Sequence, residues 1–187
     1  DMQWHAFTDA VVDLSQQFGV RLVCGLGAFP APVPHTRPVK LAATATTREL
    51  AEQVGFVPGI IEVPAGIGAA LEEAFAKAGI PTVGLWARVP HYVSGMPYPA
   101  ASAALLDGLS LLAGIEVDSR ELHTAAALTG ERIDELIANS DEHTAMVRQM
   151  ETSHDLTEEG PPLDPAHLPS GDELAAELER FLRGEQG

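Results

Sequence analysis

Two short loops of the sequence carry the residue types best suited to catalysis or ligand binding. The first reads Pro-His-Thr-Arg-Pro and contributes His35 and Arg37. The second reads Arg-Val-Pro-His-Tyr and contributes Arg88, His91 and Tyr92. Because an unperturbed imidazole titrates at about pH 6.5, either histidine could act as a general base, and the arginines could bind an anion such as a carboxylate. The two loops together therefore predict a candidate site for a small anionic ligand.

A structural role is the alternative for both loops. Pro34, Pro38 and Pro90 would hold rigid turns in which the histidine and arginine side chains hydrogen-bond neighbouring backbone. In that case both imidazoles should be buried, and replacing either one should lower the free energy of unfolding by about 1–3 kcal/mol, the cost of a lost buried hydrogen bond. We expect this structural outcome, because no nucleophile or set of metal ligands accompanies the loops.

Three glycines mark places where the backbone could approach a ligand closely. Gly25 and Gly27 follow a predicted strand, and loops in that position bind ligands in open α/β sheets. Because the third glycine of a dinucleotide-binding fingerprint is missing and prolines follow, we interpret this segment as a tight exit from the strand. Gly66 leads into a predicted helix whose free N–H groups could hold an anion, although close packing on the sheet is the commoner use of such a glycine.

The sequence contains no pattern typical of a metal or cofactor site. None of the seven histidines pairs with another at the four-residue spacing of a helix face, and there is no cluster of Cys and His. The single cysteine, Cys24, lies in an apolar strand segment, where a small buried thiol is the usual occupant. We therefore expect neither a metal nor a cofactor.

The elements that must position these loops are those of an α/β fold. The spacing of Trp4, Phe7, Val11, Leu14 and Phe18 predicts an amphipathic helix over residues 3–18. Two further helices are predicted over residues 66–79 and 98–114, and unalternating apolar runs predict strands at residues 20–26, 39–45, 60–63 and 81–89. We expect a three-layer α/β/α domain with a mainly parallel sheet. The C-terminal ends of the strands at residues 20–26 and 81–89 would then bring the two histidine loops to one edge of that sheet.

Four segments follow one another along the chain. Residues 1–114 form the predicted α/β core, which opens on a helix and is expected to lack one or more upstream strands. Residues 115–152 read as a helical extension of the same domain. Residues 153–169 are an acidic, Pro-rich linker, and residues 170–187 contain a C-terminal helix. Because so short a helix is marginal in water, we expect it to dock through its apolar stripe of Leu174, Leu178, Phe181 and Leu182.

Composition and charge limit the partners that the protein can have. The 187 residues carry a net charge of −16, which repels phosphate backbones and anionic lipid and argues against nucleic-acid binding. No apolar run approaches the roughly 20 residues that a membrane span requires. One cysteine cannot build a disulfide framework, so we expect a cytoplasmic protein that does not enter a membrane.

The loops and glycines also carry a family resemblance. Gly25-Leu26-Gly27, residues 33–38 (Val-Pro-His-Thr-Arg-Pro) and residues 86–92 (Trp-Ala-Arg-Val-Pro-His-Tyr) resemble the bacterial branch of the proteasome assembly chaperone 2 family. Residues 168–173 resemble the tail of its actinobacterial members. The resemblance implies an α/β/α domain similar to nucleoside phosphorylases. It also implies a possible protein partner such as proteasome subunits, since relatives help to assemble proteasomes without catalysing a reaction.

The resemblance also sets expectations about assembly. Members of the family usually begin further upstream, with at least one more strand, and an uncovered sheet edge must be paired. We therefore expect a homo-oligomer, with a trimer slightly ahead of a dimer. The hydrophobic–Tyr–any-residue tail of archaeal and eukaryotic relatives is not matched by residues 184–187 (Gly-Glu-Gln-Gly), so we do not expect proteasome docking by that route.

Three functions remain open at this point, in the following order. The first is a non-enzymatic assembly or protein-interaction domain. The second is a phosphorylase- or hydrolase-like enzyme that binds a small anionic ligand through His35, Arg37, Arg88 and His91. The third is an ATP-dependent carboxylate–amine ligase, an activity that has been assigned to some bacterial members of the family. A ligase needs a phosphate cradle and carboxylates for Mg²⁺, and two lysines without a phosphate-binding loop argue against it.

Overall fold

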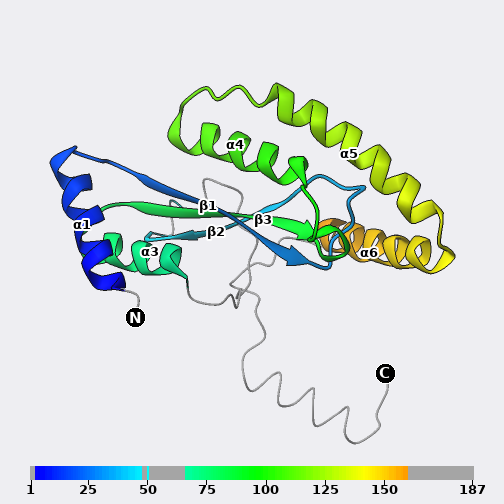
Figure 1. Cartoon of the computed structure of the whole chain (residues 1–187), viewed down its shortest axis with the longest axis horizontal. Helices are drawn as coiled ribbons and strands as arrows, with labels where there is room; N and C mark the ends of the chain where they lie inside the picture. Colours follow the sequence, from blue (N-terminus) through cyan, green and yellow to red (C-terminus); the bar gives the residue numbers. More distant parts are fainter. Residues whose placement is uncertain (1–2, 48–49, 51–65, 160–187) are drawn as a thin grey trace, which may run out of the picture. The chain divides into compact units, whose positions relative to one another are not determined.

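A three-stranded sheet lies at the centre of the described chain (Figure 1). The structure, a computed structural model, describes residues 3–47, 50 and 66–159. The strands are β1 (Val23–Ala31), β2 (Leu41–Ala45) and β3 (Thr82–Pro90), in the spatial order β1-β3-β2. The chain divides into two compact units, residues 1–151 and residues 152–187, and the sheet belongs to the first. The described elements make a mixed α/β fold, as the sequence predicts.

The directions of the strands differ from the expected ones. β1 is parallel to β3, but β2 is antiparallel to it, so the prediction of a mainly parallel sheet is wrong for the strand expected at residues 39–45. The reason is the connection between β1 and β2, residues 32–40. A return to a parallel strand needs a crossover of roughly a dozen residues or more, whereas a short proline-containing segment reverses the chain at the end of the sheet.

β1 begins and ends later than the strand predicted at residues 20–26. The glycine segment interpreted as a strand exit lies inside β1, where Gly25 pairs with Gly84 and Pro30 pairs with Val89. Pro30 is compatible with a strand because β1 lies at the edge of the described sheet, where a missing N–H donor costs no ladder bond. Gly25 and Gly27 are therefore strand residues and not parts of a ligand-binding loop.

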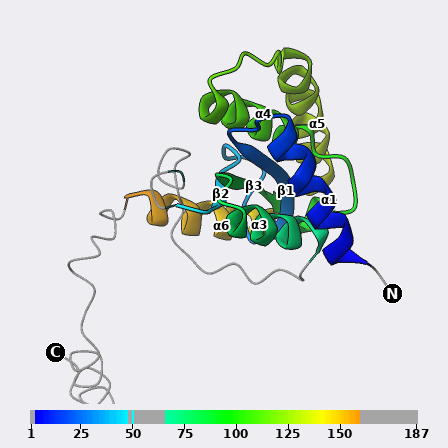
Figure 2. The same ribbon diagram turned by 90° about the vertical axis from the view of Figure 1, so that its left-hand side faces the viewer.

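Helices lie on both sides of the sheet (Figures 1 and 2). On one side are α4 (Pro99–Ala113) and α5 (Arg120–Ala138), and on the other is α3 (Ile67–Lys77). α1 (Trp4–Gln17) packs beside α3, and α6 (Asp141–Glu159) follows α5 along the chain. A short 3-10 helix, η1 (His91–Val93), follows β3 directly. The helices predicted at residues 3–18, 66–79 and 98–114 are all present.

The sheet packs closely on α4. Val83 and Leu85 of β3 are fully buried, and they share one face of the sheet with Leu41 of β2. Gly108 of α4 lies so near this face that an added Cβ would come within 2.6 Å of Leu41 Cδ1. The glycine thus allows a close approach between helix and sheet, and this contact covers the central strand.

The α1 helix buries only part of the face that its apolar spacing indicated, since Val11 packs against the core while other residues of that face are exposed. Its buried side chains are Thr8 and Val12, and Val12 joins Phe75 of α3 in a small core. Phe7, Leu14 and Phe18 are 51%, 50% and 81% exposed, respectively. We call these three residues the α1 stripe. α1 contacts the neighbouring α3 through the side that contains residues 8 and 12, and this contact determines which side of α1 is buried.

Two of the predicted secondary-structure elements lie outside the described residues. These are the strand at residues 60–63 and the C-terminal helix of residues 170–187 with its stripe of Leu174, Leu178, Phe181 and Leu182. The helical extension corresponds to α5 and α6. α6 continues through residues 153–159, which were assigned to the linker, because the prolines of that stretch begin only at Pro161.

Replacing Gly27 by alanine should destabilise the sheet. A Cβ at this position would lie 2.6 Å from Cε3 and Cζ3 of the Trp86 ring, so the ring must move. We expect Gly27→Ala to lower the free energy of unfolding by about 1–2 kcal/mol, the scale of overpacking. Urea denaturation followed by tryptophan fluorescence measures this.

A glycine with free space around it provides the matched control. No atom lies within 4 Å of a Cβ built at Gly130 in α5, so Gly130→Ala should raise the free energy of unfolding by about 0.5–1 kcal/mol through helix propensity. If Gly27→Ala were as stable as Gly130→Ala, the close contact with Trp86 would not matter.

Candidate functional site

The two histidine loops meet in the structure. β1 and β3 are parallel, and their last residues, Ala31 and Pro90, are partners in the register. The loops therefore leave the sheet at the same end. The backbone N–H of His35 donates a hydrogen bond of 2.8 Å to the Tyr92 hydroxyl, and the His35 ring nitrogen Nδ1 lies 2.7 Å from the same oxygen. The expected convergence of the loops is thus present, with Tyr92 as the residue that joins them.

His35 is held on both ring nitrogens. Its side chain is 3% exposed, and Nε2 lies 2.9 Å from Oδ1 of Asp134 in α5. Tyr92 already accepts the backbone N–H of His35, so its own hydroxyl proton can point to Nδ1. Nε2 then carries the ring proton and donates it to the Asp134 carboxylate. One consistent arrangement of protons therefore satisfies all three groups.

Tyr92 acts as a hydroxyl donor and not as a phenolate. Burial raises the pKa of Tyr92 to about 12, and the hydrogen bond from the His35 backbone offsets only part of that rise. A nucleophilic or basic tyrosine requires the opposite shift. The geometry between Tyr92 and His35 therefore fits a structural link between the two loops better than a proton relay.

Arg37 and its neighbour bind a second carboxylate. Arg37 Nη1 lies 3.3 Å from Oε1 of Glu151 in α6, and the Thr36 hydroxyl donates to the same oxygen. The loop of residues 32–40 is consequently attached to α5 through His35 and to α6 through Arg37. We call His35, Arg37, Tyr92, Asp134 and Glu151 the loop cluster. Since each basic side chain in it faces a carboxylate, the loop cluster does not support the alternative of a site for a small anionic ligand.

The remaining residues of the second loop are arranged differently. His91 is exposed, and its ring lies edge-on to that of Tyr92, with 5.5 Å between the centroids. Its carbonyl accepts the Ser94 hydroxyl at 2.8 Å, which closes the turn of η1. Arg88 lies in β3, where its backbone N–H donates to the Lys40 carbonyl. The expectation that both imidazoles are buried and bonded to backbone is therefore wrong for His91, and His35 uses side-chain partners on its ring.

The acidic members of the loop cluster were missed by the sequence analysis. Asp134 and Glu151 lie in helices about a hundred residues beyond the loop in sequence. Each is one of 27 acidic residues in a strongly acidic chain. No local pattern distinguishes them, so the folded arrangement alone identifies them.

The glycine and cysteine candidates lie away from the loop cluster. Gly66 directly precedes α3 in extended backbone and provides no side-chain cap. Cys24 is half-buried in β1, and burial raises the pKa of its thiol, which disfavours the reactive thiolate.

Within residues 3–47, 50 and 66–159, no group of three His, Cys, Asp or Glu side chains is placed to hold a metal ion. No helix in the same part of the chain is long and apolar enough to cross a membrane.

The partly buried hydroxyl of Tyr92 predicts a pH dependence of stability. An exposed tyrosine has a pKa of about 10, whereas burial raises the pKa of Tyr92 in the folded protein to about 12. Between these values the unfolded chain loses the phenol proton while the folded chain keeps it. The free energy of unfolding should therefore fall as the pH rises through this window.

We expect Tyr92→Phe to show a shallower fall than the wild-type protein between about pH 10 and pH 12. Urea denaturation at a series of pH values measures both curves. Burial also raises the pKa of Tyr98, but that residue is present in both proteins and its effect cancels in the comparison. Parallel curves would contradict the assignment to Tyr92.

Comparisons with known proteins provide a second line of information. The model of the PAC2 family matches residues 1–137. A Mycobacterium tuberculosis structure of unknown function is 35% identical, with a TM-score of 0.80, and the match covers 86% of this chain and 56% of that one. A proteasome-assembly chaperone homologue from the same species is 37% identical, with a TM-score of 0.70 and coverage of 79% and 62%. A PAC2 family protein of Streptomyces avermitilis is 36% identical, with the same TM-score and coverage.

The chain spans less than two thirds of the length of each of these structures. No protein of curated function matches it significantly. The comparisons therefore support a fold and a family, while a partner has to be argued from the chain itself.

Proposed function

The chain belongs to the PAC2 family, and from this membership we propose that it is a non-enzymatic, assembly-chaperone-like domain that binds a protein partner. One of its relatives is a proteasome-assembly chaperone homologue. The partner class that we propose is therefore a subunit of a proteasome-like complex, bound before or during assembly. Such a role needs a stable surface and does not need a reacting group.

The observation that carries this proposal is the closed loop cluster. His35 is the residue best suited to act as a base, but its side chain is buried and both ring nitrogens are occupied. The raised pKa of Tyr92 keeps its proton in place. This arrangement does not support the phosphorylase- or hydrolase-like alternative, and no observation on the described residues favours a ligase.

The α1 stripe supports the protein-binding half of the proposal. Phe7 and Leu14 lie along one side of α1, Phe18 follows at its C-terminal end, and all three are at least half exposed. Large apolar side chains that gather on an exposed face mark sites of protein–protein contact. Aromatic residues are also enriched in interface cores. We propose that the partner covers this stripe.

Mixing the purified protein with unassembled proteasome subunits of the source organism tests the proposal. We expect co-elution in gel filtration and faster assembly on native gels. The variant Leu14→Ser/Phe18→Ser should lose both effects, while Leu128→Ser, which changes an exposed leucine of α5, should keep them. Absence of any complex with the wild-type protein would contradict the proposal, as would turnover of a nucleoside with phosphate or of ATP with a carboxylate and an amine.

We further propose a three-layer, nucleoside-phosphorylase-like arrangement for the complete domain and a cytoplasmic location. The proposed organisation keeps residues 1–114 as the core, 115–152 as its helical extension and 170–187 as a terminal helix. Of the linker predicted at residues 153–169, residues 153–159 continue α6. Helices on both sides of the described sheet support the first point. The single thiol of Cys24 supports the second, since it excludes a disulfide framework.

A homo-oligomer is part of the same proposal, with a trimer slightly ahead of a dimer. β1 forms an edge of the described sheet, and an exposed strand edge tends to pair with another chain. Light scattering coupled to gel filtration at micromolar concentration should give a multiple of the 19.8 kDa chain mass. A monomer mass would contradict this prediction.

A further inference from the structure

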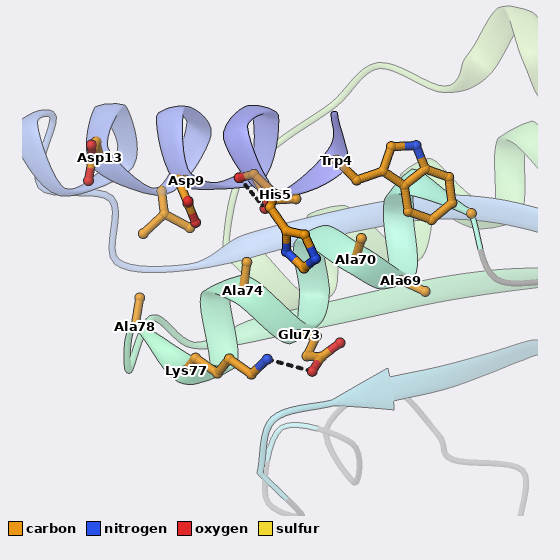
Figure 3. Close-up of a pocket in the computed structure, with 13 residues that line it drawn as sticks. Trp4, His5, Asp9, Asp13, Ala69, Ala70, Glu73, Ala74, Lys77 and Ala78 are labelled. Atoms are coloured by element: carbon orange, nitrogen blue, oxygen red, sulfur yellow. Dashed lines mark hydrogen bonds and ion pairs between the residues drawn. The ribbon is translucent and has the colours of Figure 1, made fainter. Parts of the chain in front are cut away.

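A groove between α1 and α3 has the size and shape of a docking site (Figure 3). Its volume is about 550 Å³, and both helices contribute walls along most of their length. We call it the α1–α3 groove. The residues that define it here are Trp4, Asp9, Asp13, Ala70, Ala74 and Lys77. It is separate from the loop cluster and from the α1 stripe, which lies on another side of α1.

The α3 wall of the groove is made of small side chains. Ala70, Ala74 and Ala78 follow one another at four-residue spacing, so they lie on one face of α3. Figure 3 shows these short side chains beneath α1. Since an alanine surface lets another backbone or a large apolar side chain approach closely, the groove can accept the apolar side of an added helix in the way that helices normally pack.

The α1 wall carries negative charge that the described residues do not neutralise. Asp9 and Asp13 lie one turn apart and line the groove, and neither makes a hydrogen bond or an ion pair within the described part of the chain. On the α3 wall, Lys77 is paired with Glu73 at 2.6 Å (Figure 3). The lysine is therefore engaged by its own helix, and the two aspartates give the groove its net charge.

The helix dipoles add to this charge at one end of the groove. Figure 3 places Trp4 and Ala69 at one end and Asp13 and Ala78 at the other, so α1 and α3 run in the same direction. Their C-terminal ends, which carry partial negative charge, thus lie together near Asp13. The net charge of −16 has the same sign. A basic partner is complementary to this surface, and an acidic one is repelled.

We propose that the α1–α3 groove docks a basic amphipathic helix of the protein partner. Apolar residues of that helix rest on the alanines of α3, and its lysines or arginines meet Asp9 and Asp13. Trp4 at the far end offers an aromatic face to a further apolar or cationic side chain. This inference rests on the proposed function for the existence of a protein partner, and it specifies the chemistry of the segment that binds.

A labelled model peptide tests the groove directly. The probe is a fluorescein-labelled amphipathic helical peptide of lysine and leucine, and its counterpart of glutamate and leucine is the negative probe. Fluorescence anisotropy should show saturable binding of the basic peptide alone. Asp9→Asn/Asp13→Asn should weaken that binding about tenfold, because two charge pairs are lost. Ala70→Trp, which fills the groove without changing charge, should abolish it.

A matched variant separates the groove from the general acidity of the protein. Glu131 and Glu135 in α5 are exposed and have the same four-residue spacing as the two aspartates. Glu131→Gln/Glu135→Gln should leave peptide binding unchanged. An equal loss in both double variants would overturn the inference, as would equal binding of the acidic peptide or no saturable binding at all.

The outcome also distinguishes this inference from the proposed function. If the wild-type protein bound proteasome subunits and the Asp9→Asn/Asp13→Asn variant bound them equally well, the proposed function would stand and the groove would not be the docking site. If the basic peptide bound in the groove while no subunit bound, the inference would stand and the proposed partner class would fail.

Discussion

Replacing Ile133 by alanine should remove about 2–5 kcal/mol from the free energy of unfolding, the range measured for large-to-small changes in protein cores. Ile133 is 1% exposed and is the buried side chain of α5. It immediately precedes Asp134, so the same turn of helix places the carboxylate that binds His35. Loss of its packing should therefore weaken both the helix contact and the attachment of the loop.

Leu136 provides the control for this prediction. It lies on the same helix, is apolar and of similar volume, and is 57% exposed. Leu136→Ala should change the free energy of unfolding by no more than about 0.5 kcal/mol. Urea denaturation measures both variants. Their midpoints can be compared directly if the free energy of unfolding depends equally steeply on urea concentration in the two proteins. Similar losses in the two proteins would show that α5 does not pack through Ile133 as described.

The second large effect is expected at His35. His35→Ala removes the ring contacts to Tyr92 and Asp134 and leaves the Tyr92 hydroxyl without its ring acceptor. An unsatisfied, partly buried polar group costs about 1–3 kcal/mol, and the lost imidazole also leaves a gap. We therefore expect a loss near the upper end of that range, measured by thermal and urea denaturation.

His91 is the natural control, since it is the same residue type in the partner loop. Its side chain is exposed and its ring touches Tyr92 only edge-on. His91→Ala should cost no more than about 0.5 kcal/mol. If His35→Ala were as stable as the wild-type protein and instead lost binding of phosphate or a nucleoside, the loop cluster would be a ligand site after all.

The sequence predicted the helices of the core more accurately than the strands. The apolar spacing at residues 3–18, 66–79 and 98–114 identified α1, α3 and α4, because helix formation depends on neighbours within a few residues. β3 was also located closely, since an unbroken apolar run indicates a strand covered on both faces. The start and end of β1 were not located correctly, because they depend on pairing with β3 rather than on local composition.

The direction of β2 and the buried face of α1 show the limits of local pattern. An apolar run carries no information about the direction of the strand, and only the length of the connection between β1 and β2 favours a reversal. On α1, the spacing identified the amphipathic helix, but contact with α3 selected Thr8 and Val12 for burial. Three of the five residues that looked like a core stripe became the exposed α1 stripe, while Val11 packs against the core.

By itself, the sequence determined that the chain is an α/β protein with strong negative charge and two proline-bounded histidine loops, and it contained the motifs of its family. Each of these properties is local or additive along the chain. Only the tertiary structure decided the environment of the loops. It placed Asp134 and Glu151 against His35 and Arg37, and it left His91 exposed. Such contacts join residues about a hundred positions apart, so they arise from packing and leave no signal in local spacing.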